Sequence, residues 1–331
     1  MKNEFQNNNI IFLNDDEIEI LKNLALKNNF NPSKNPELFC QESKQLSKSL
    51  LESIKNILND FLKNGNENGF LLIKNFPIND KELEKTPKCN KLHIGENTIL
   101  AKVQSIIMNY IGDMISYEAE GDGYLFQDVI PDIRMKNIQT SLGSNTELEV
   151  HIEQAFSKLR PDILSLGCLR GDENAFTYIL PVGKLLENLN NDEIEILYKP
   201  LWMTSVDFSF KLNGNDFIDG DVRGPFPILS GELTDPFFLF DQDLMFGITE
   251  ESQKILKKII NIYYNNRIKH NLQPGEIILI DNNRSIHGRS SFSPKYDGND
   301  RFLIRCFSTF DYKKSSYARP NGSRTVSAIY S

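Results

Sequence analysis

Residues 146–153 read Thr-Glu-Leu-Glu-Val-His-Ile-Glu, and this stretch decides the fold that we expect. Its apolar residues alternate with polar ones, which is the period-two pattern of a β-strand with one apolar and one polar face. We therefore expect a strand over 148–153, with His151 and Glu153 projecting from the same face. An imidazole and a carboxylate in this arrangement can bind one metal ion. A bare His-X-Glu triplet arises often by chance, so a third ligand has to be found elsewhere.

The chain holds four histidines, and His287 is the best candidate for that third ligand. It follows a turn, an apolar stretch over 277–280 and a polar exit, so we place it at the mouth of a strand. His93 lies in a lysine-rich loop and His270 follows a helical stretch, and we expect both to be solvated. Two imidazoles and one carboxylate are the ligands of mononuclear non-haem Fe(II) oxygenases, which leave positions open for a co-substrate and O₂.

Residues 300–307 read Asp-Arg-Phe-Leu-Ile-Arg-Cys-Phe, and this pattern predicts a second informative strand. Arg301 and Arg305 share one face of it, while the apolar residues at alternate positions share the other. A buried guanidinium is costly unless it meets an anion, and its planar shape suits a carboxylate. The two arginines therefore imply two carboxylates, one on a co-substrate and one on the substrate. The alternative is that one of them, more readily Arg305, pairs with an acidic residue of the protein.

The composition bounds the class of protein. The chain has 331 residues, 40% of them hydrophobic and 25% charged, which is typical of a globular protein with an ample core. A net charge of −8 and a pI of about 5.2 argue against a nucleic-acid or anionic-membrane partner. The four cysteines show no metal-binding spacing, and we find no signal peptide or membrane span. We expect a cytoplasmic protein with reduced thiols, and its oligomeric state stays open.

The order of the predicted elements favours an α+β domain whose β region is a sandwich or jelly roll. No internal repeat or linker divides the chain, so we predict one domain over 1–331, with a helical region over 1–68, a core over 69–310 and a tail over 311–331. We expect a first helix that begins near Asp15 and further helices over 41–63, 97–115, 182–189, 192–197 and 249–265. The expected strands cover 69–74, 124–129, 148–153, 163–169, 175–180, 277–280 and 302–307.

Two segments resemble one known family. The first, within 143–170, holds the His-Ile-Glu triplet followed by Arg-Pro-Asp and Cys-Leu-Arg. The second, 281–301, holds Asp-Asn-Asn-Arg-Ser-Ile-His-Gly-Arg and ends in Asp-Gly-Asn-Asp-Arg. Both resemble the clavaminate synthase-like oxygenases, Fe(II)- and 2-oxoglutarate-dependent dioxygenases that include hydroxylases of free arginine, asparagine and lysine. The resemblance covers roughly 70–307 and implies a double-stranded β-helix, the cupin-like jelly roll, with N-terminal and inserted helices.

The resemblance also implies roles for the metal-binding residues. By position, His151, Glu153 and His287 resemble the iron ligands. The middle position of the triplet is usually Thr or Asn in the family and is Ile152 here, which should alter packing rather than ligation because it faces away from the metal. Related halogenases lack the carboxylate, so the retained Glu153 points to hydroxylation, or less often to desaturation or cyclisation.

Further roles follow from the resemblance at the ends of the predicted pocket. Arg301 resembles the arginine that binds the distal carboxylate of 2-oxoglutarate, with Thr177 as a second partner. Arg305 resembles the arginine that holds the α-carboxylate of the substrate. Gln127 resembles a residue that contacts the amino group of the substrate, and Ser141 lies in the loop before the metal strand and could line the pocket.

Asp241 and Asp243 are the best candidates for recognition of the substrate side chain. They lie in Leu-Phe-Asp-Gln-Asp-Leu-Met, an apolar setting before a helix, and two acids suit a guanidinium or ammonium. The alternative is a solvated loop or a helix-capping acid. We therefore expect hydroxylation of a free basic L-amino acid, arginine or lysine. A neutral amino acid, a small acid such as a sulfonate, and a non-catalytic cupin-like binding protein remain the alternatives.

Overall fold

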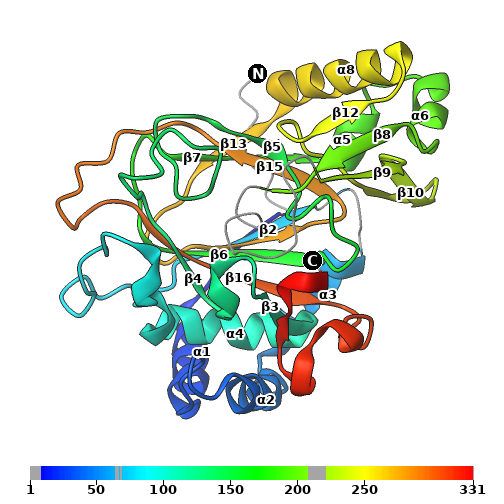
Figure 1. Cartoon of the computed structure of the whole chain (residues 1–331). Coiled ribbons are helices and arrows are strands. Elements are labelled where there is room, and N and C mark those ends of the chain that lie inside the picture. The colour runs from blue at the N-terminus through cyan, green and yellow to red at the C-terminus, as the bar shows by residue number, and fades with distance from the viewer. Residues whose placement is uncertain (1–8, 64–66, 68, 208–220, 331) are drawn as a thin grey trace.

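The computed structural model describes residues 9–63, 67, 69–207 and 221–330, and within these ranges a larger and a smaller β-sheet face each other (Figure 1). Their strands are β1 Ile10–Phe12, β2 Phe70–Lys74, β3 Asp113–Tyr117, β4 Gln127–Val129, β5 Leu148–His151, β6 Ile163–Arg170, β7 Phe176–Pro181, β13 Ile268–Asn271, β14 Ile277–Asp281, β15 Ser285–Arg289, β16 Phe302–Thr309 and β17 Thr325–Val326. The larger sheet has eight strands in the order β1-β2-β14-β6-β16-β3-β17, with β4 paired to β16. The smaller sheet has four, in the order β13-β7-β15-β5.

Strand β16 shows how the sequence pattern separates the two faces of the larger sheet. Phe302, Ile304 and Cys306 belong to the core on the helix side of this sheet. Leu303 and Phe307 belong to a second core, which also contains residues of the smaller sheet. The predicted alternation is therefore confirmed. Arg305 of this strand and Arg301, which directly precedes it, line the same cavity as Leu303.

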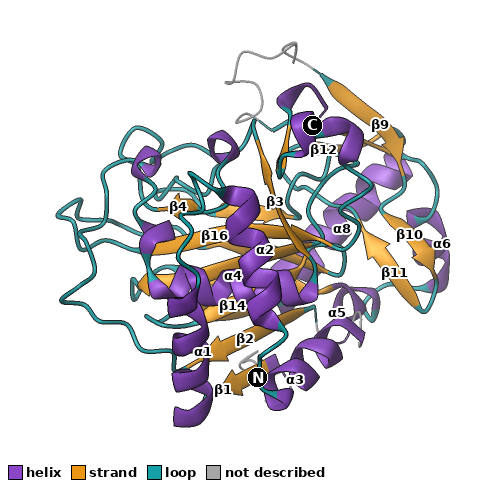
Figure 2. Ribbon diagram, turned by 90° about the horizontal axis from the view of Figure 1, so that it is seen from below, coloured by secondary structure: helices purple, strands orange, loops and turns teal. Residues whose placement is uncertain are grey.

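Helices cover the outer face of each sheet. The helices α1 Asp15–Lys27, α2 Pro36–Ser47, α3 Glu52–Lys63 and α4 Ile99–Ile111 lie against the larger sheet, as Figures 1 and 2 show. A capping box at Asn14 begins α1, and the side chain of Thr98 caps α4. The helices α5 Val182–Leu186, α6 Asn191–Leu197 and α8 Glu250–Asn266 share a core with the smaller sheet.

Smaller elements lie beside α8. The strands β8 Trp202–Ser205, β9 Val222–Phe226 and β12 Met245–Gly247 form a three-stranded sheet, and β10 Leu229–Glu232 pairs with β11 Asp235–Phe238. Single turns of 3₁₀-helix lie at Asn90–Leu92, Gly95–Asn97, Gly121–Gly123, Ser316–Ala318, Pro320–Gly322 and Ala328–Tyr330. The mixture of helices and sheets agrees with the predicted α+β class. No helix in the described ranges is long and apolar enough to cross a membrane.

Two helix predictions were wrong at their boundaries. The helix expected over 41–63 is two helices, because the chain turns through 48–51 with tight backbone bonds such as Ser49 N–H to Leu46 O. Buried residues of both helices belong to the same core. The helix expected over 97–115 ends at Ile111, and the residues that follow form β3 because pairing with β16 outweighs their helical pattern.

The segment after β16 is tied to the rest of the chain. β17 pairs in parallel with β3, and the side chain of Arg324 donates to Glu37 of α2 and to the carbonyl oxygen of Met114. Residues 1–8 of the predicted helical region and residue 331 of the predicted tail lie outside the described residues. The C-terminal segment therefore covers the edge of the larger sheet at β3.

The turn before β14 allows a test of the fold. Gly275 has a φ of 85°, and a Cβ there would lie 1.7 Å from the carbonyl oxygen of Phe76. We expect Gly275→Ala to lower the free energy of unfolding by about 3 kcal/mol, because backbone strain and a backbone clash add. Gly322→Ala is the control, since Gly322 has a φ of 67° and no atom within 4 Å of the added Cβ. It should cost only about 1 kcal/mol. Equal losses in urea denaturation would contradict the clash argument.

Candidate metal centre and substrate pocket

His151, Glu153 and His287 form a cluster between the two sheets. His151 of β5 lies directly opposite His287 of β15, with ring centroids 4.6 Å apart. Nε2 of His287 lies 3.3 Å from Oε1 of Glu153. The potential ligand atoms of the three residues all lie within 4.8 Å of one another. Side chains that are 136 positions apart in sequence therefore converge on one point through strand pairing.

The local structure of this cluster differs from two predictions. β5 ends at His151, so Glu153 does not belong to the strand. Instead, Oδ1 of Asn282 accepts the backbone N–H of Glu153 at 2.7 Å, and the Asn282 amide donates to the Glu153 carbonyl at 3.1 Å. His287 is not at a strand mouth but inside β15, since the turn at 282–284 reverses the chain before it. Ile152 packs in the core with α8, as predicted.

The chemistry of this donor set fits a divalent metal. Nδ1 of His151 donates to the carbonyl oxygen of Glu149 at 2.7 Å, which leaves Nε2 for a metal. Burial, and then His151, lower the pKa of His287, which favours the neutral imidazole that binds metals. Burial alone would raise the pKa of Glu153, but Arg305 and the two histidines outweigh it and lower the pKa to about 2. Glu153 and His287 therefore favour the protonation states of metal ligands.

Arg301 is a buried cation that lines the cavity containing the cluster. It is 5% exposed, and no hydrogen bond or ion pair joins its guanidinium to another residue among those that the structure describes. Burial lowers its pKa to about 10. Thr177 of β7 lines the same cavity of about 190 Å³. A buried guanidinium that faces a cavity without an anion is a ready carboxylate site.

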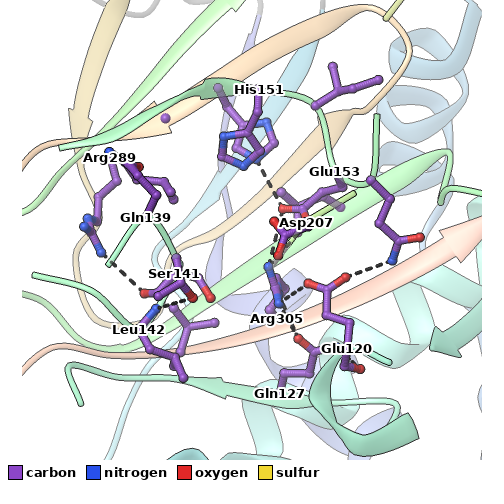
Figure 3. A pocket seen from close by; sticks show the side chains of 18 of the residues that line it. Glu120, Gln127, Gln139, Ser141, Leu142, His151, Glu153, Asp207, Arg289 and Arg305 are labelled. Atoms are coloured by element: carbon purple, nitrogen blue, oxygen red, sulfur yellow. Dashed lines mark hydrogen bonds and ion pairs between the residues drawn. The ribbon is translucent and has the colours of Figure 1, made fainter. Parts of the chain in front are cut away.

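Arg305 is paired within the protein, unlike Arg301. Its guanidinium contacts Glu120 and lies 3.3 Å from Oε2 of Glu153 (Figure 3). Nε of Arg305 donates to Oε1 of Gln127 at 3.0 Å. In the structure, Arg305 therefore pairs with acidic residues of the protein, which is the alternative that the sequence left open. It does not exclude substrate binding, because all of these groups line the cavity.

Acidic side chains gather near the metal cluster. Asp241 and Asp243 both line the cavity, and so does Asp207. Burial, with smaller contributions from Asp207 and Asp243, raises the pKa of Asp241 to about 7. Asp241 reaches this position because residues 240–242 pair with the free edge of β5, where Ile152 N–H donates to Phe240 O at 2.9 Å. Asp241 also accepts the backbone N–H of Leu244.

Glu120, Asp207 and Arg289 are among the cavity residues that the sequence did not reveal. Glu120 lies in a turn rich in glycine and acids, a pattern that usually indicates a solvated loop. Asp207 comes two residues after the end of β8, where a polar residue could have been noticed. Arg289 belongs to the family-like segment 281–301 but had no role assigned to it. Ser141 lines the cavity as expected, and its carbonyl oxygen accepts a bond from Arg289.

The other two histidines are not simply solvated as expected. Nε2 of His270 lies 2.6 Å from the carboxylate of Glu276, and the ring of His93 stacks on Tyr124 at a centroid distance of 3.5 Å. The expectation failed because Glu276, six residues along the chain, pairs with His270, and Tyr124 of another segment stacks on His93. Neither residue lines the cavity.

Comparisons with known proteins agree with this geometry. Residues 228–307 match the model of the taurine catabolism dioxygenase TauD, TfdA family. The chain is 45% identical over 293 residues to L-lysine 3-hydroxylase of Catenulispora acidiphila, covering 88% of this chain and 82% of the relative. It is 29% identical over 272 residues to clavaminate synthase 2 of Streptomyces clavuligerus, covering 81% and 82% of the two chains. The chain belongs to the clavaminate synthase-like oxygenases.

A solved structure extends the comparison to the fold of this oxygenase. Asparagine oxygenase in complex with Fe(II), 2S,3S-3-hydroxyasparagine and succinate matches it with a TM-score of 0.88 and 26% identity, covering 96% of this chain and 99% of that chain. The oxygenase is therefore a non-haem iron enzyme that uses 2-oxoglutarate and hydroxylates an amino acid. The resemblance stated from the two sequence segments is confirmed.

The metal cluster can be tested without turnover. We expect His151→Ala and His287→Ala to weaken Fe(II) binding by more than roughly a hundredfold, which is the upper range for the loss of a residue that only supports a ligand. Binding would be measured by anaerobic titration of the apoprotein. His93→Ala is the control, because this histidine lies outside the cluster. Tight binding of one equivalent of Fe(II) by either ligand variant would contradict the assignment.

Proposed function

We propose that this oxygenase hydroxylates a free basic L-amino acid, L-lysine ahead of L-arginine, at C3. The observation that carries the proposal is the acidic wall of the cavity, where Asp207, Asp241 and Asp243 lie in one cavity with the metal cluster. The relative with 45% identity is an L-lysine 3-hydroxylase, which supports both the substrate and the carbon atom. A free amino acid also suits a cavity of about 190 Å³.

A cationic side chain would satisfy the acidic wall. Burial raises the pKa of both Asp241 and Asp243, which means that it penalises their charged forms more than neighbouring groups such as His151 stabilise them. An ammonium group supplies further stabilisation. A neutral or anionic side chain would leave a buried carboxylate unpaired, at a cost of about 3–5 kcal/mol. The acidic wall therefore selects for a basic substrate and against a sulfonate.

The α-amino and α-carboxylate groups would bind at Arg305. In the proposed complex, the α-carboxylate takes the place of Glu120 on the guanidinium of Arg305, and the α-ammonium lies between Glu120 and Oε1 of Gln127. The zwitterion then replaces an ion pair that the structure already contains. This exchange is favourable because the protein groups are already desolvated in the empty site. Ser141 would complete the wall of the cavity.

Another group in the cavity suits the co-substrate. Arg301, which contacts no carboxylate among the described residues, would bind the distal carboxylate of 2-oxoglutarate, with Thr177 as a second partner. His151, Glu153 and His287 would hold Fe(II). Bound iron supplies the oxidation, in which O₂ and 2-oxoglutarate are consumed and succinate and CO₂ are released with the hydroxylated amino acid. The protein orients the two organic molecules and excludes bulk water.

We also infer one domain with a double-stranded β-helix core. Two facing sheets with the metal cluster between them support this architecture. The N-terminal helices and the C-terminal strand β17 both pack on the larger sheet, which supports a single domain rather than two. The proposal also includes a cytoplasmic location and a small-molecule partner.

A substrate panel tests the proposed function. The iron-loaded enzyme would be incubated with 2-oxoglutarate and each proteinogenic amino acid in air, and products gaining one oxygen atom would be detected by mass spectrometry. We expect lysine to react fastest and arginine to follow. Asp241→Asn should lower kcat/KM for lysine by at least about tenfold, because it removes a buried counter-charge. Faster turnover of glutamate or a sulfonate than of lysine would contradict the proposal.

The two arginines should affect different reactants. We expect Arg301→Ala to raise the KM for 2-oxoglutarate by roughly a hundredfold, since a desolvated bidentate contact contributes a few kcal/mol. Arg305→Ala should raise the KM for the amino acid and uncouple 2-oxoglutarate decarboxylation from hydroxylation. Succinate and hydroxylated product would be measured together in steady-state assays. A change only in the 2-oxoglutarate KM in both variants would refute the separate roles.

A further inference from the structure

Arg289 is a buried arginine that holds backbone carbonyls rather than a carboxylate. It lies on β15 two positions after His287 and is 4% exposed. Its Nη1 donates to Gly143 O at 2.5 Å and to Ser141 O at 3.4 Å, and Nη2 donates to Thr146 O at 3.0 Å. Nε donates to Ser290 O at 3.0 Å. One guanidinium thus donates hydrogen bonds to three backbone carbonyl groups within residues 141–146.

The segment that Arg289 holds adjoins the wall of the cavity, and Ser141 belongs to that wall. Residues 139–142 line the cavity, and Figure 3 shows the Arg289 side chain reaching toward Ser141 and Leu142. The same segment leads into β5, which carries His151. Phe292 adds one more attachment, since its backbone N–H donates to Ser144 O at 2.9 Å. The position of this wall therefore depends on contacts from the strand that carries His287 and the residues after it.

The charge of Arg289 is not neutralised by a contacting carboxylate in the described residues. Glu147 acts on it electrostatically, but the carboxylate of Glu147 is held by Arg267. Burial, and then the neighbouring Arg301, lower the pKa of Arg289 to about 9. The guanidinium groups of Arg289 and Arg301 lie 5.2 Å and 5.9 Å from the ring centroid of Phe292. Arg289 and Arg301 are therefore two buried cations that lie close to Phe292 and act on each other electrostatically.

We propose that Arg289 is a positioning residue with two separable effects on the reaction. Its fork of donors holds residues 141–146 and so positions Ser141 and Leu142 in the wall of the amino-acid site, and its charge strengthens the binding of the dianion 2-oxoglutarate at Arg301. The first effect requires the planar guanidinium, because one ammonium cannot reach three carbonyls in this geometry. The second requires only a positive charge. The inference rests on the proposed function for the identity of the two reactants.

Two variants separate the effects. Arg289→Lys keeps the charge and loses the fork, whereas Arg289→Met loses both and keeps much of the volume. Arg319→Met is a matched control, because Arg319 is also buried, donates to the carbonyls of Ser323 and Tyr312, and lies outside the cavity. It should lower the Tm as the Arg289 variants do. It should leave the binding of both reactants unchanged.

Three measurements give the readout. The Kd of 2-oxoglutarate would be measured by calorimetry on the Mn(II)-loaded protein, amide hydrogen exchange would be followed over 141–147, and KM and kcat would be measured for lysine. Arg289→Lys should leave the Kd within about threefold but speed exchange and raise the lysine KM roughly tenfold or more. Arg289→Met should do the same and also weaken 2-oxoglutarate binding roughly tenfold or more.

The possible failures are distinct. An unchanged 2-oxoglutarate Kd in Arg289→Met overturns the charge effect, and unchanged exchange over 141–147 in both variants overturns the fork. Equal losses of lysine and 2-oxoglutarate affinity in Arg319→Met would show that the changes report stability alone, which also overturns the proposal. If the wild-type protein binds 2-oxoglutarate but hydroxylates no basic amino acid, the proposed substrate is wrong, while calorimetry and exchange still decide the role of Arg289.

Discussion

The pairing of β5 with β15 is the constraint on which the site depends. It places His151 opposite His287, and the Asn282 side chain at the start of the turn before β15 holds the backbone of Glu153. The free edge of β5 pairs with residues 240–242 and brings Asp241 beside the cluster. A shift of one residue in this register would turn every side chain of β5 to the opposite face. The strand pairing of β5 therefore positions both the two histidines of the metal cluster and Asp241 of the acidic wall.

Burial of charge between two sheets gives the cavity its chemical character. Arg305 is matched by Glu120 and Glu153, so its own charge is compensated before any ligand binds. Arg301 has no such carboxylate partner among the described residues, and burial raises the pKa of Asp241 to about 7. Buried charge that is only partly compensated is costly. The protein tolerates it at the two places where a charged reactant would bind, which is typical of functional sites.

The cavity consequently carries two separate groups of charge. Arg301 and Arg289 lie around Phe292 and favour a dianion, whereas Asp241 lies beside His151 and, with Asp243, favours a cation. The metal cluster lies in the same cavity. These charges disfavour an exchange of places between the two organic reactants, because each would meet like charge at the other's site. Orientation therefore follows from electrostatics as well as from shape.

The sequence by itself determined the features that depend on local periodicity and spacing. These were the alternating strand before Glu153, the common face of Arg301 and Arg305, and the family-like segments that pointed to iron and 2-oxoglutarate. Only the tertiary structure decided that 41–63 bends into two helices, that 113–117 forms a strand, and that Glu120 meets Arg305. The physical reason is the distance along the chain over which each feature is determined. A side-chain period is set by the backbone within a few residues, whereas strand partners and ion pairs depend on segments that approach only after the sheets have formed.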